Sequence, residues 1–317
     1  MNRDLRGFLE QIEALGPDYY ARVSKPVDPL YEPCVIQEKL AAAGRYPVLH
    51  FEHVNGSSLQ PIPVTTISAA KAPVKEIIWN DIDLSRLPIP KHAEKDSGKY
   101  FTIAYLVLRD PETGIINAGV YRHEIKGKDS FACMFNPSHH AGYIYRRYKE
   151  LKRPMEAVLV VGHHPAAVMG SLLRGPMESN EFEVMGALLG ESLEVVPAET
   201  VDLPVPAWAK IAIEGVIDPT AETLDGPFAE YTGFYGPAKD PVALMRVRAV
   251  TMRKNAIFHD LDPSHREHNL SGSLPFEASV FDSVKKLVPS VQGVYMPSRG
   301  SIFCPHEVRA PRKRGIQ

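Results

Sequence analysis

Residues 100–130 read YFTIAYLVLRDPETGIINAGVYRHEIKGKDS, and this stretch decides the fold class. Its first half, YFTIAYLVLRD, is mostly aromatic and aliphatic, a composition that favours a strand. A turn at PETG follows, and INAGVYRHEIKGKDS predicts a second, alternating strand that ends in another turn. We therefore expect a hairpin-type pair at the start of a β-rich domain that extends from about residue 100 to about residue 290.

Residues 1–99, which precede the hairpin, predict a small α/β domain. A helix is expected over residues 4–15, where apolar side chains share one face: Leu5, Phe8, Leu9, Ile12 and Leu15. A second helix over residues 33–44, stopped by Gly44, and a strand over residues 46–54 follow. A proline-rich connector then leads into the β-rich domain.

Beyond the hairpin, expected strands alternate with a few helices. Helices are expected over residues 139–154, 178–190 and 276–291, and residues 242–260 predict a long β hairpin or bulged ribbon. Residues 291–317 resemble the start of a further α/β domain, which we expect to be incomplete. The expected fold class is α+β, with an N-terminal α/β domain, a β-rich centre and the beginning of a C-terminal unit.

The composition excludes several classes of protein. At 317 residues, with 44% hydrophobic and 23% charged residues, the chain has the make-up of a soluble globular protein with one or two domains. A formal net charge of −2 argues against nucleic acid or an anionic membrane surface as the main partner. The most apolar run is interrupted by two histidines and a proline, so no membrane span is expected. Three scattered cysteines favour a reducing, cytoplasmic location.

Two positions in the β-rich domain carry residues that suit a ligand, and each has an ordinary explanation. Arg122 ends the segment NAGVYR, where it is either an exposed edge charge or a guanidinium that binds a carboxylate bidentately. Glu181 begins an expected helix, where it is either a first-turn acid or a hard oxygen ligand for a divalent ion. The doublets His139–His140 and His163–His164, taken alone, are more typical of packed or surface histidines than of ligands.

The segment 225–236 reads DGPFAEYTGFYG and is called the acid loop here. Its acids, Asp225 and Glu230, flank a Gly-Pro pair in which Pro227 fixes its own φ and Gly226 permits unusual backbone angles. Two acids and one arginine suit acid–base chemistry on a carboxylate substrate, in which a carboxyl group with a raised pKa delivers a proton. The ordinary alternative is a solvated acidic turn.

Six motifs, taken in order, resemble those of the UbiD family of reversible decarboxylases: LPIPKHAEKDSGKYFT, RDPETGIINAGVYR, NPSHHAGYIY, GSLLRGPMESNEFEVMG, DLPVPAWAKIAIEG and DGPFAEYTGFYG. The resemblance runs from about residue 4 to the end of the chain. It implies an N-terminal α/β domain, a central split β-barrel of the flavin-reductase type over residues 100–290, and a C-terminal α/β domain that begins at residue 291. Members of the family are longer, so we expect the C-terminal domain to be truncated.

The resemblance also implies a cofactor, prenylated FMN, whose phosphate is held through a divalent ion, Mn²⁺ or Mg²⁺, together with K⁺. The implied metal ligands are Asn117, His140 and Glu181, with His139 as the alternative to His140. Further implied cofactor contacts lie beside the flavin and in the potassium and phosphate cradle: Val120, Tyr121, Arg122, Ala118, Ser171, Leu172 and Leu173. Lys210 stands where the family's motif usually has an acid, and we expect this position to be structural.

By this resemblance the chain is expected to be a carboxy-lyase that acts reversibly, without oxidation, on an aromatic or α,β-unsaturated carboxylic acid. Arg122 is expected to hold the carboxylate, Glu230 to donate the proton, and Asp225, often Glu in the family, to complete the network. A flavin prenyltransferase is the expected supplier of the cofactor, and a homo-oligomer is the expected assembly. The competing interpretation is a non-catalytic or partner-dependent subunit, whose partner supplies the missing C-terminal part.

Overall fold

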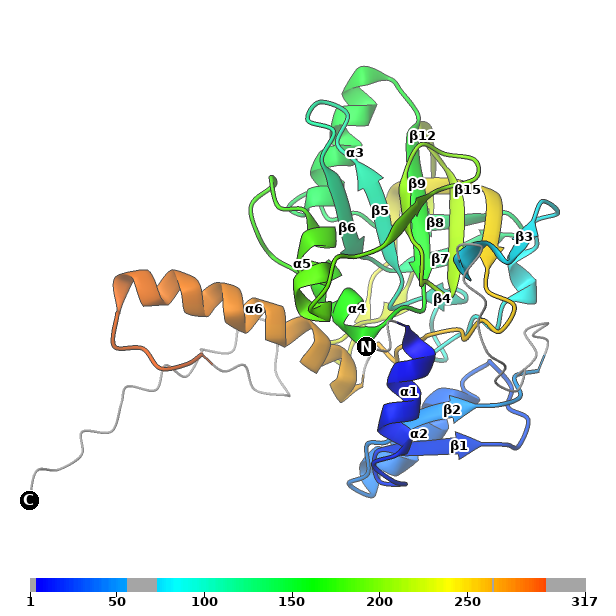
Figure 1. The fold of residues 1–317 in the computed structure, drawn as a ribbon. Helices are drawn as coiled ribbons and strands as arrows, with labels where there is room; N and C mark the ends of the chain where they lie inside the picture. The colour runs from blue at the N-terminus through cyan, green and yellow to red at the C-terminus, as the bar shows by residue number, and fades with distance from the viewer. Residues whose placement is uncertain (1–3, 56–72, 264, 295–317) are drawn as a thin grey trace, which may run out of the picture.

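A curled antiparallel sheet forms the centre of the molecule (Figure 1). The structure, a computed structural model, describes residues 4–55, 73–263 and 265–294. Eight strands follow one another across the sheet, and a ninth pairs with one of them. Phe131 and Leu159 are among the fully buried side chains of the sheet. The order across the sheet is β4 (Tyr100–Phe101), β7 (His123–Gly127), β8 (Ser130–Cys133), β15 (Lys239–Met252), β12 (Ile211–Asp225), β9 (Met155–Val161), β5 (Tyr105–Arg109) and β6 (Ile116–Val120), and β3 (Ile77–Trp79) pairs with β15.

The hairpin expected within residues 100–130 is confirmed, because β5 and β6 pair in antiparallel fashion. The second strand is shorter than predicted: β6 ends at Val120, and β7 turns away to pair with β4 and β8. The break occurs at Tyr121, whose ring folds back over Gly119, where a Cβ atom would lie only 2.5 Å from the Tyr121 hydroxyl. Arg122 therefore leaves the sheet at the end of β6 instead of continuing the alternation.

Two long strands, β12 and β15, form the middle of the sheet and bend it. They pair in antiparallel fashion with register shifts, the first of them between Glu214 and Gly215. Such irregularities bend a strand and increase its twist, which curls the sheet. The sequence predicts a hairpin or bulged ribbon over residues 242–260, whereas the structure has a single bulged strand that ends at Met252.

Two apolar cores lie on the two faces of the sheet. Leu159 of β9 belongs to the first core and its neighbours Val158 and Val160 to the second, because successive side chains of a strand point to opposite faces. The helix α3 (His140–Leu151), which the sequence predicts, packs on the first core through Ile144. The second core is covered by α4 (Pro165–Ser171), α5 (Glu181–Leu189), β10 (Val195–Pro197) and β11 (Pro204–Pro206).

A smaller α/β layer, drawn in blue in Figure 1, lies beside the sheet. It consists of α1 (Leu5–Glu13), β1 (Tyr20–Val23), α2 (Glu32–Ala42) and β2 (Val48–Phe51), and β1 pairs with β2 in parallel. Both predicted helices are confirmed, but β1 is absent from the prediction because four residues are too few to show a clear alternation. Leu5 and Leu9 are buried as expected, whereas Leu15 is exposed because α1 ends before it. Two 3₁₀ turns, η1 (Pro73–Lys75) and η2 (Leu84–Arg86), lie between this layer and β4.

A buried ionic cluster joins α1 to the sheet. Asp4, the N-cap of α1, accepts hydrogen bonds from Gly7 N at 3.0 Å, from Lys210 Nζ at 2.7 Å and from Arg253 Nη1. Burial acts to raise the pKa of Asp4, but Lys210 and Arg253 outweigh it and lower that pKa to about 2. Burial lowers the pKa of Lys210 to about 8. The free-energy cost of burying the ammonium group therefore offsets the stabilisation that the carboxylate gains from its hydrogen-bond donors. The structural role expected of Lys210 is therefore to anchor the first helix.

We expect Asp4→Asn to lower the free energy of unfolding at pH 7 by roughly 3 kcal/mol, because it leaves two buried cations without their counter-charge. The pKa of Asp4 falls from an ordinary 3.8 to about 2 on folding. The stability that this carboxylate contributes is thus complete above about pH 4 and is lost as the pH falls toward 2. Urea unfolding at pH 7 and at pH 3 measures both effects, with the exposed Asp18→Asn as the control. Equal stability of Asp4→Asn and the wild type at pH 7 would contradict the anchor.

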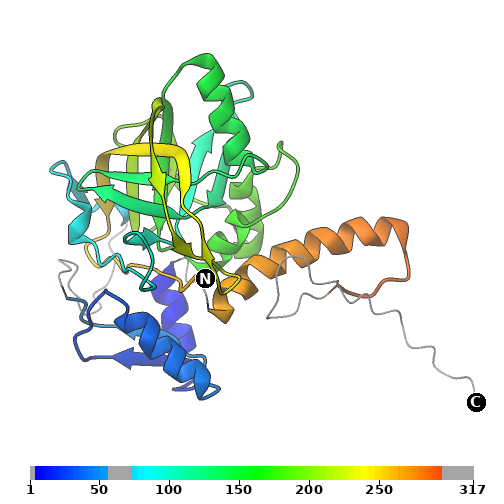
Figure 2. The ribbon, with the colours of Figure 1, turned by 180° about the vertical axis from the view of Figure 1, so that it is seen from behind.

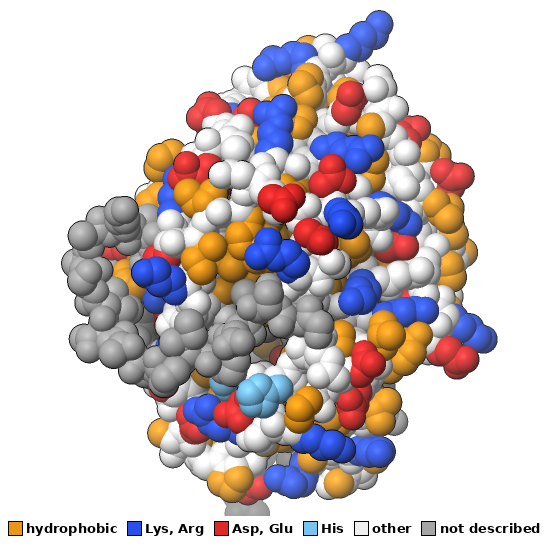
Figure 3. All heavy atoms as spheres, turned by 90° about the vertical axis from the view of Figure 1, so that its right-hand side faces the viewer, with side chains coloured by type: hydrophobic (Ala, Val, Ile, Leu, Met, Phe, Trp, Pro, Cys, Tyr) orange, Lys and Arg blue, Asp and Glu red, His pale blue; other side chains and the backbone are white. Residues whose placement is uncertain are grey.

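The helix α6 (Arg266–Leu287) runs away from the sheet in both views (Figures 1 and 2). It begins ten residues before the predicted start at residue 276, because the helix continues through Pro275. Residues 295–317, which hold most of the expected C-terminal unit, lie outside the described residues. None of the described helices has both the length and the apolar character needed to cross a membrane. On the face shown in Figure 3, basic and acidic side chains are interspersed.

Candidate active site

Arg122 lies between β6 and β7 and binds both acids of the acid loop. Its Nε and Nη2 atoms donate to Asp225 Oδ2 at 2.8 and 2.5 Å, and its Nη1 donates to Glu230 Oε1. The acids lie 103 and 108 positions further along the chain. The guanidinium carbon is also 4.9 Å from the centre of the Phe228 ring, within the range of a cation–π contact. The structure therefore brings together the three residues that the sequence predicts as catalytic.

The two acids differ in their access to solvent. Asp225 is fully buried, whereas the side chain of Glu230 is 29% exposed. Burial raises the pKa of Asp225, and Arg122 opposes this without overcoming it. Burial acts to lower the pKa of Arg122, but the two carboxylates outweigh it and raise that pKa, so the guanidinium stays charged. Glu230 is thus the acid that an incoming ligand can reach.

The acid loop holds Glu230 in a tight turn between two short strands, β13 (Phe228–Ala229) and β14 (Tyr235–Gly236), which pair with each other. Glu230 N donates to the carbonyl oxygen of Phe234 at 2.9 Å. Gly236 gives the carboxylate its room, because a Cβ atom at that position would lie 2.9 Å from Glu230 Oε1. The turn and the glycine together set the direction in which the Glu230 side chain points.

Three of the predicted metal ligands meet at the start of α5. Glu181 is 2% exposed, and its Oε1 atom accepts a hydrogen bond from Asn117 Nδ2 at 3.0 Å. Its Oε2 atom accepts from Ala118 N at 3.0 Å, and His140 Nδ1 lies 3.6 Å from Oε1. Asn180 supplies the side-chain cap of α5. Glu181 therefore points toward β6 and away from the first turn of its own helix.

The geometry favours His140 over His139 at this cluster. His139 precedes α3 and its ring lies near Tyr121, with the ring centres 6.4 Å apart, whereas His140 faces Glu181. The neighbouring carboxylate of Glu181 is the main reason that the pKa of His140 is raised. A proton on this imidazole and a metal ion compete for the same carboxylate.

The donor set at this cluster fits a hard divalent ion. It offers a carboxylate, an imidazole and an amide oxygen, and Asn117 Oδ1 is buried without a hydrogen-bond partner among the described residues. Only two of the three groups are of the His, Cys, Asp or Glu type. Within the described ranges, no three side chains of those four types gather as a metal site. A metal here therefore depends on the amide of Asn117 turning its oxygen toward the ion.

The end of α4 lies beside this cluster. Ser171 is buried and its hydroxyl donates to the carbonyl oxygen of Val168 at 2.7 Å, so the hydroxyl is engaged within the helix. Val168 belongs to a small apolar cluster with Ile103 and Leu261, against which Val120 of β6 packs. The predicted residues Leu172 and Leu173 follow at the end of α4, where Leu172 is the C-cap. Asn117 and Arg122 are at most about 18 Å apart along the chain, because they are five residues apart. The Glu181 cluster and the Arg122 network thus lie at the two ends of one six-residue stretch of chain.

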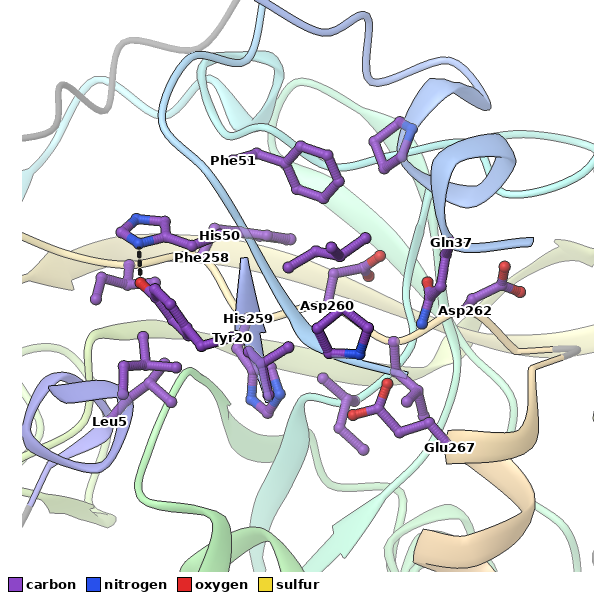
Figure 4. A pocket seen from close by; sticks show the side chains of 18 of the residues that line it. Leu5, Tyr20, Gln37, His50, Phe51, Phe258, His259, Asp260, Asp262 and Glu267 are labelled. Atoms are coloured by element: carbon purple, nitrogen blue, oxygen red, sulfur yellow. Dashed lines mark hydrogen bonds between the residues drawn. The ribbon is translucent and has the colours of Figure 1, made fainter. Parts of the chain in front are cut away.

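A cavity of about 1050 Å³ lies elsewhere, between the N-terminal layer and the segment that leads into α6 (Figure 4). Tyr20 and His50 lie at one end of it and are hydrogen-bonded to each other, whereas Asp260 and Glu267 lie at the other end. Its lining contains none of the predicted catalytic or metal-binding residues. We assign the candidate site to the Arg122 network instead, because an acid–base reaction requires charged groups that converge, as Arg122, Asp225 and Glu230 do.

Several residues outside the predicted set support the acid loop. Ser97 N donates to the carbonyl oxygen of Pro227 at 2.9 Å, and the ring of Tyr100 lies 4.4 Å from that of Phe228. Asp96 and Glu124 also contact the loop. The motif KDSGKY contains three of these residues, and its several polar side chains ahead of an apolar strand were the one available signal.

Comparison with known proteins gives concordant matches. The family model of the 3-octaprenyl-4-hydroxybenzoate carboxy-lyase (UbiD) Rift-related domain matches residues 65–265. An uncharacterized protein in the cooM 5' region of Rhodospirillum rubrum is 32% identical over 98% of this chain and 74% of its own length. Anhydromevalonate phosphate decarboxylase of Methanothermobacter thermautotrophicus is 33% identical over 69% of this chain and 51% of its own length.

A solved structure matches as well. The UbiD-class enzyme HmfF from Pelotomaculum thermopropionicum, an evolved dimeric form in complex with prFMN, has a TM-score of 0.86 and is 33% identical. The match covers 94% of this chain and 76% of HmfF. The chain thus spans about three quarters of HmfF and about half of the anhydromevalonate phosphate decarboxylase.

Proposed function

The chain belongs to the UbiD family of carboxy-lyases, and on that premise we propose that it catalyses the reversible, non-oxidative decarboxylation of an aromatic or α,β-unsaturated carboxylic acid with prenylated FMN. The observation that carries the proposal is the bonding of Arg122 to both Asp225 and Glu230. A solvated acidic turn does not account for a guanidinium that comes from more than a hundred residues earlier in the chain and binds both acids.

Arg122 is proposed to bind the carboxylate of the substrate. Three of its five N–H groups are used by the two acids, which leaves one on Nη1 and one on Nη2. The fully buried Asp225 fixes the position of the guanidinium, so little freedom is lost when a ligand binds. A substrate carboxylate can accept hydrogen bonds from these two remaining N–H groups, next to the Glu230 carboxyl group.

Glu230 is proposed to donate the proton. When carbon dioxide leaves, the bond between the substrate carbon and the carboxyl carbon breaks, and a C–H bond must form at the same carbon. Bound prenylated FMN supplies the electron sink for the pair left behind. The partly exposed Glu230 can reach that carbon and regain its proton from solvent, whereas Asp225 cannot.

The cofactor and its ions are proposed to bind along β6. Asn117, His140 and Glu181 would hold Mn²⁺ or Mg²⁺ against the phosphate, and the backbone near Ala118 and at Ser171–Leu173 would cradle K⁺ and the phosphate. Val120 and Tyr121 would lie beside the flavin ring. The donor types at Glu181, and the complex of HmfF with prFMN, support this arrangement.

The finer architecture belongs to the same proposal. The curled sheet corresponds to a split β-barrel of the flavin-reductase type over residues 100–290, between a domain of residues 1–99 and a C-terminal unit that begins at residue 291. A cytoplasmic homo-oligomer, supplied with cofactor by a flavin prenyltransferase, is the proposed state. HmfF is dimeric in its evolved form, which supports an oligomer.

The alternative is a subunit that needs a partner chain to complete its site. The observation in its favour is that the vanillic acid decarboxylase of Sedimentibacter hydroxybenzoicus, a structure of similar fold, contains a second component, ShVdcD. The particle mass together with the flavin content separates the two proposals. A cofactor-free monomer that gains activity only with a second chain supports the alternative.

Co-production with a flavin prenyltransferase is expected to yield a coloured protein with a bound-flavin absorption spectrum, which releases carbon dioxide from at least one acid. The test panel should contain aromatic, furan and α,β-unsaturated carboxylic acids, each assayed by loss of substrate and by deuterium incorporation from D₂O. Protein produced without the prenyltransferase is the control. A flavin spectrum without turnover of any acid would contradict the proposed activity, and no flavin at all would contradict the cofactor.

A further inference from the structure

Two buried carboxylates outside the predicted catalytic set bind the backbone of the acid loop. Glu124 binds the amide that follows Asp225 in the chain, and Asp96 binds the amide that precedes Glu230. We propose that Glu124 and Asp96 are positioning residues, which set the directions of the two catalytic acids. This inference rests on the proposed function for the chemistry that the acids perform.

Glu124 lies on β7, two residues after Arg122, and is 3% exposed. Its Oε2 atom accepts hydrogen bonds from Gly226 N at 2.9 Å and from the Tyr100 hydroxyl at 3.0 Å. Its Oε1 atom pairs with Lys126 Nζ at 2.8 Å. Hydrogen bonds to a charged acceptor are about twice as strong as neutral ones. The Glu124 carboxylate thus connects β7, which begins directly after Arg122, to the Gly226 amide that follows Asp225.

Asp96 lies in the connection between η2 and β4 and is 3% exposed. Its Oδ1 atom accepts from Ala229 N at 2.8 Å, and its Oδ2 atom accepts from Ala93 N at 2.9 Å. The next residue, Ser97, donates its N–H to the carbonyl oxygen of Pro227. The segment around Asp96 therefore lies along the acid loop and binds the residue before Phe228 and the residue after it.

An aromatic contact joins the two anchors to the arginine. The ring of Tyr100, whose hydroxyl is bound by Glu124, lies 4.4 Å from the ring of Phe228. The ring of Phe228 lies in turn 4.9 Å from the guanidinium carbon of Arg122. A displacement of the Glu124 side chain would therefore reach Arg122 through the rings of Tyr100 and Phe228. It would also reach the acid loop directly, through the Gly226 amide.

The placement of these bonds favours a role in positioning over a purely structural one. Another buried carboxylate, Glu214 on β12, also accepts backbone hydrogen bonds, from Glu199 N and Thr200 N. It lies eleven residues before Asp225, and among the described residues its hydrogen bonds go to residues 199 and 200, not to the acid loop. Proton transfer responds steeply to geometry, and a displacement of about 1 Å can cost roughly 100-fold in rate. A change at Glu124 should therefore affect catalysis in a way that the same change at Glu214 does not.

The test compares Glu124→Asp, which keeps the charge but shortens the reach, with Glu124→Gln, which keeps the reach and one acceptor oxygen. Glu214→Asp is the matched control for the loss of a buried acceptor. Each protein is produced with the prenyltransferase and assayed on the panel acid that the wild type converts fastest. Amide hydrogen exchange over residues 225–230, measured on the cofactor-free protein, reports the loop independently of activity.

Glu124→Asp is expected to lower kcat by about 10- to 100-fold with KM nearly unchanged, and to lower protection of the loop amides by about tenfold. Glu124→Gln should keep most of kcat, and Glu214→Asp should leave both kcat and loop protection at the wild-type values. If Glu124→Asp does not fold, Asp96→Asn takes its place, since it can no longer accept from both Ala93 and Ala229.

Unchanged loop protection in the shortened variant overturns the proposal, as does a loosened loop with unchanged kcat. An equal fall of kcat in Glu124→Asp and Glu214→Asp also overturns it, because the effect is then one of general stability. If the wild type itself converts no acid, the proposed function falls, while hydrogen exchange still decides whether Glu124 anchors the loop.

Discussion

Glu230→Gln is expected to abolish decarboxylation while leaving the flavin bound. The variant keeps the shape of the side chain but has no acidic proton to give, so the C–H bond cannot form at a useful rate. General acid catalysis typically contributes about 10²- to 10⁴-fold, so we expect kcat to fall by about 1000-fold. The measurement is turnover of the best panel acid, together with deuterium incorporation from D₂O and the absorption spectrum of the holoenzyme.

The matched control for this substitution is Glu222→Gln. Glu222 lies on β12 and forms an ion pair with Lys149 at the surface, 2.7 Å between the charged atoms. Its loss removes the same charge, eight residues earlier in the chain, without touching Arg122, so kcat should stay within about twofold, as surface pairs contribute little. Wild-type turnover in Glu230→Gln would assign the proton to another group and remove the role proposed for Glu230.

The parts of the fold that the sequence predicts well are those with long, uninterrupted patterns. The β5–β6 hairpin, α1, α3 and α5 follow from runs of apolar residues at strand or helix spacing. The length of α6 does not follow, because Pro275 reads as a helix start and yet lies inside the helix. The break between β6 and β7 depends on the Tyr121 ring lying over Gly119, a contact that no periodicity shows.

The candidate site also contains residues that could be predicted from the sequence and residues that could not. Arg122, Asp225 and Glu230 could be predicted because their residue types are chemically distinctive and stand in motifs. Their meeting could not, since it depends on the curled sheet bringing residue 122 beside acids that lie 103 and 108 positions later in the chain. Glu124 and Asp96 could not be predicted, because both act on backbone amides, which leave no mark on the residue types they contact.

Glu181→Gln is expected to remove the cofactor from the protein. The substitution keeps the volume of the side chain but takes away the one formal negative charge of the Asn117–His140–Glu181 cluster, in a site that is 2% exposed. Loss of even an outer partner of a metal ligand costs about 10- to 100-fold in metal affinity, and loss of the anionic ligand itself should exceed that. We expect manganese and flavin in the purified, co-produced protein each to fall below about a tenth of the wild-type content.

Glu183→Gln is the natural control, because Glu183 lies in the same first turn of α5 and is exposed. Both substitutions remove one negative charge from the first turn of α5, where such a charge contributes about 0.3–1 kcal/mol. Metal content by mass spectrometry and flavin content by absorbance then isolate what the buried carboxylate does. Equal manganese and flavin in the two variants would show that Glu181 is a structural partner of Asn117 and Ala118 and not a ligand. Selective loss in Glu181→Gln would instead place the phosphate end of the cofactor at the start of α5, and so orient the flavin along β6 toward Arg122.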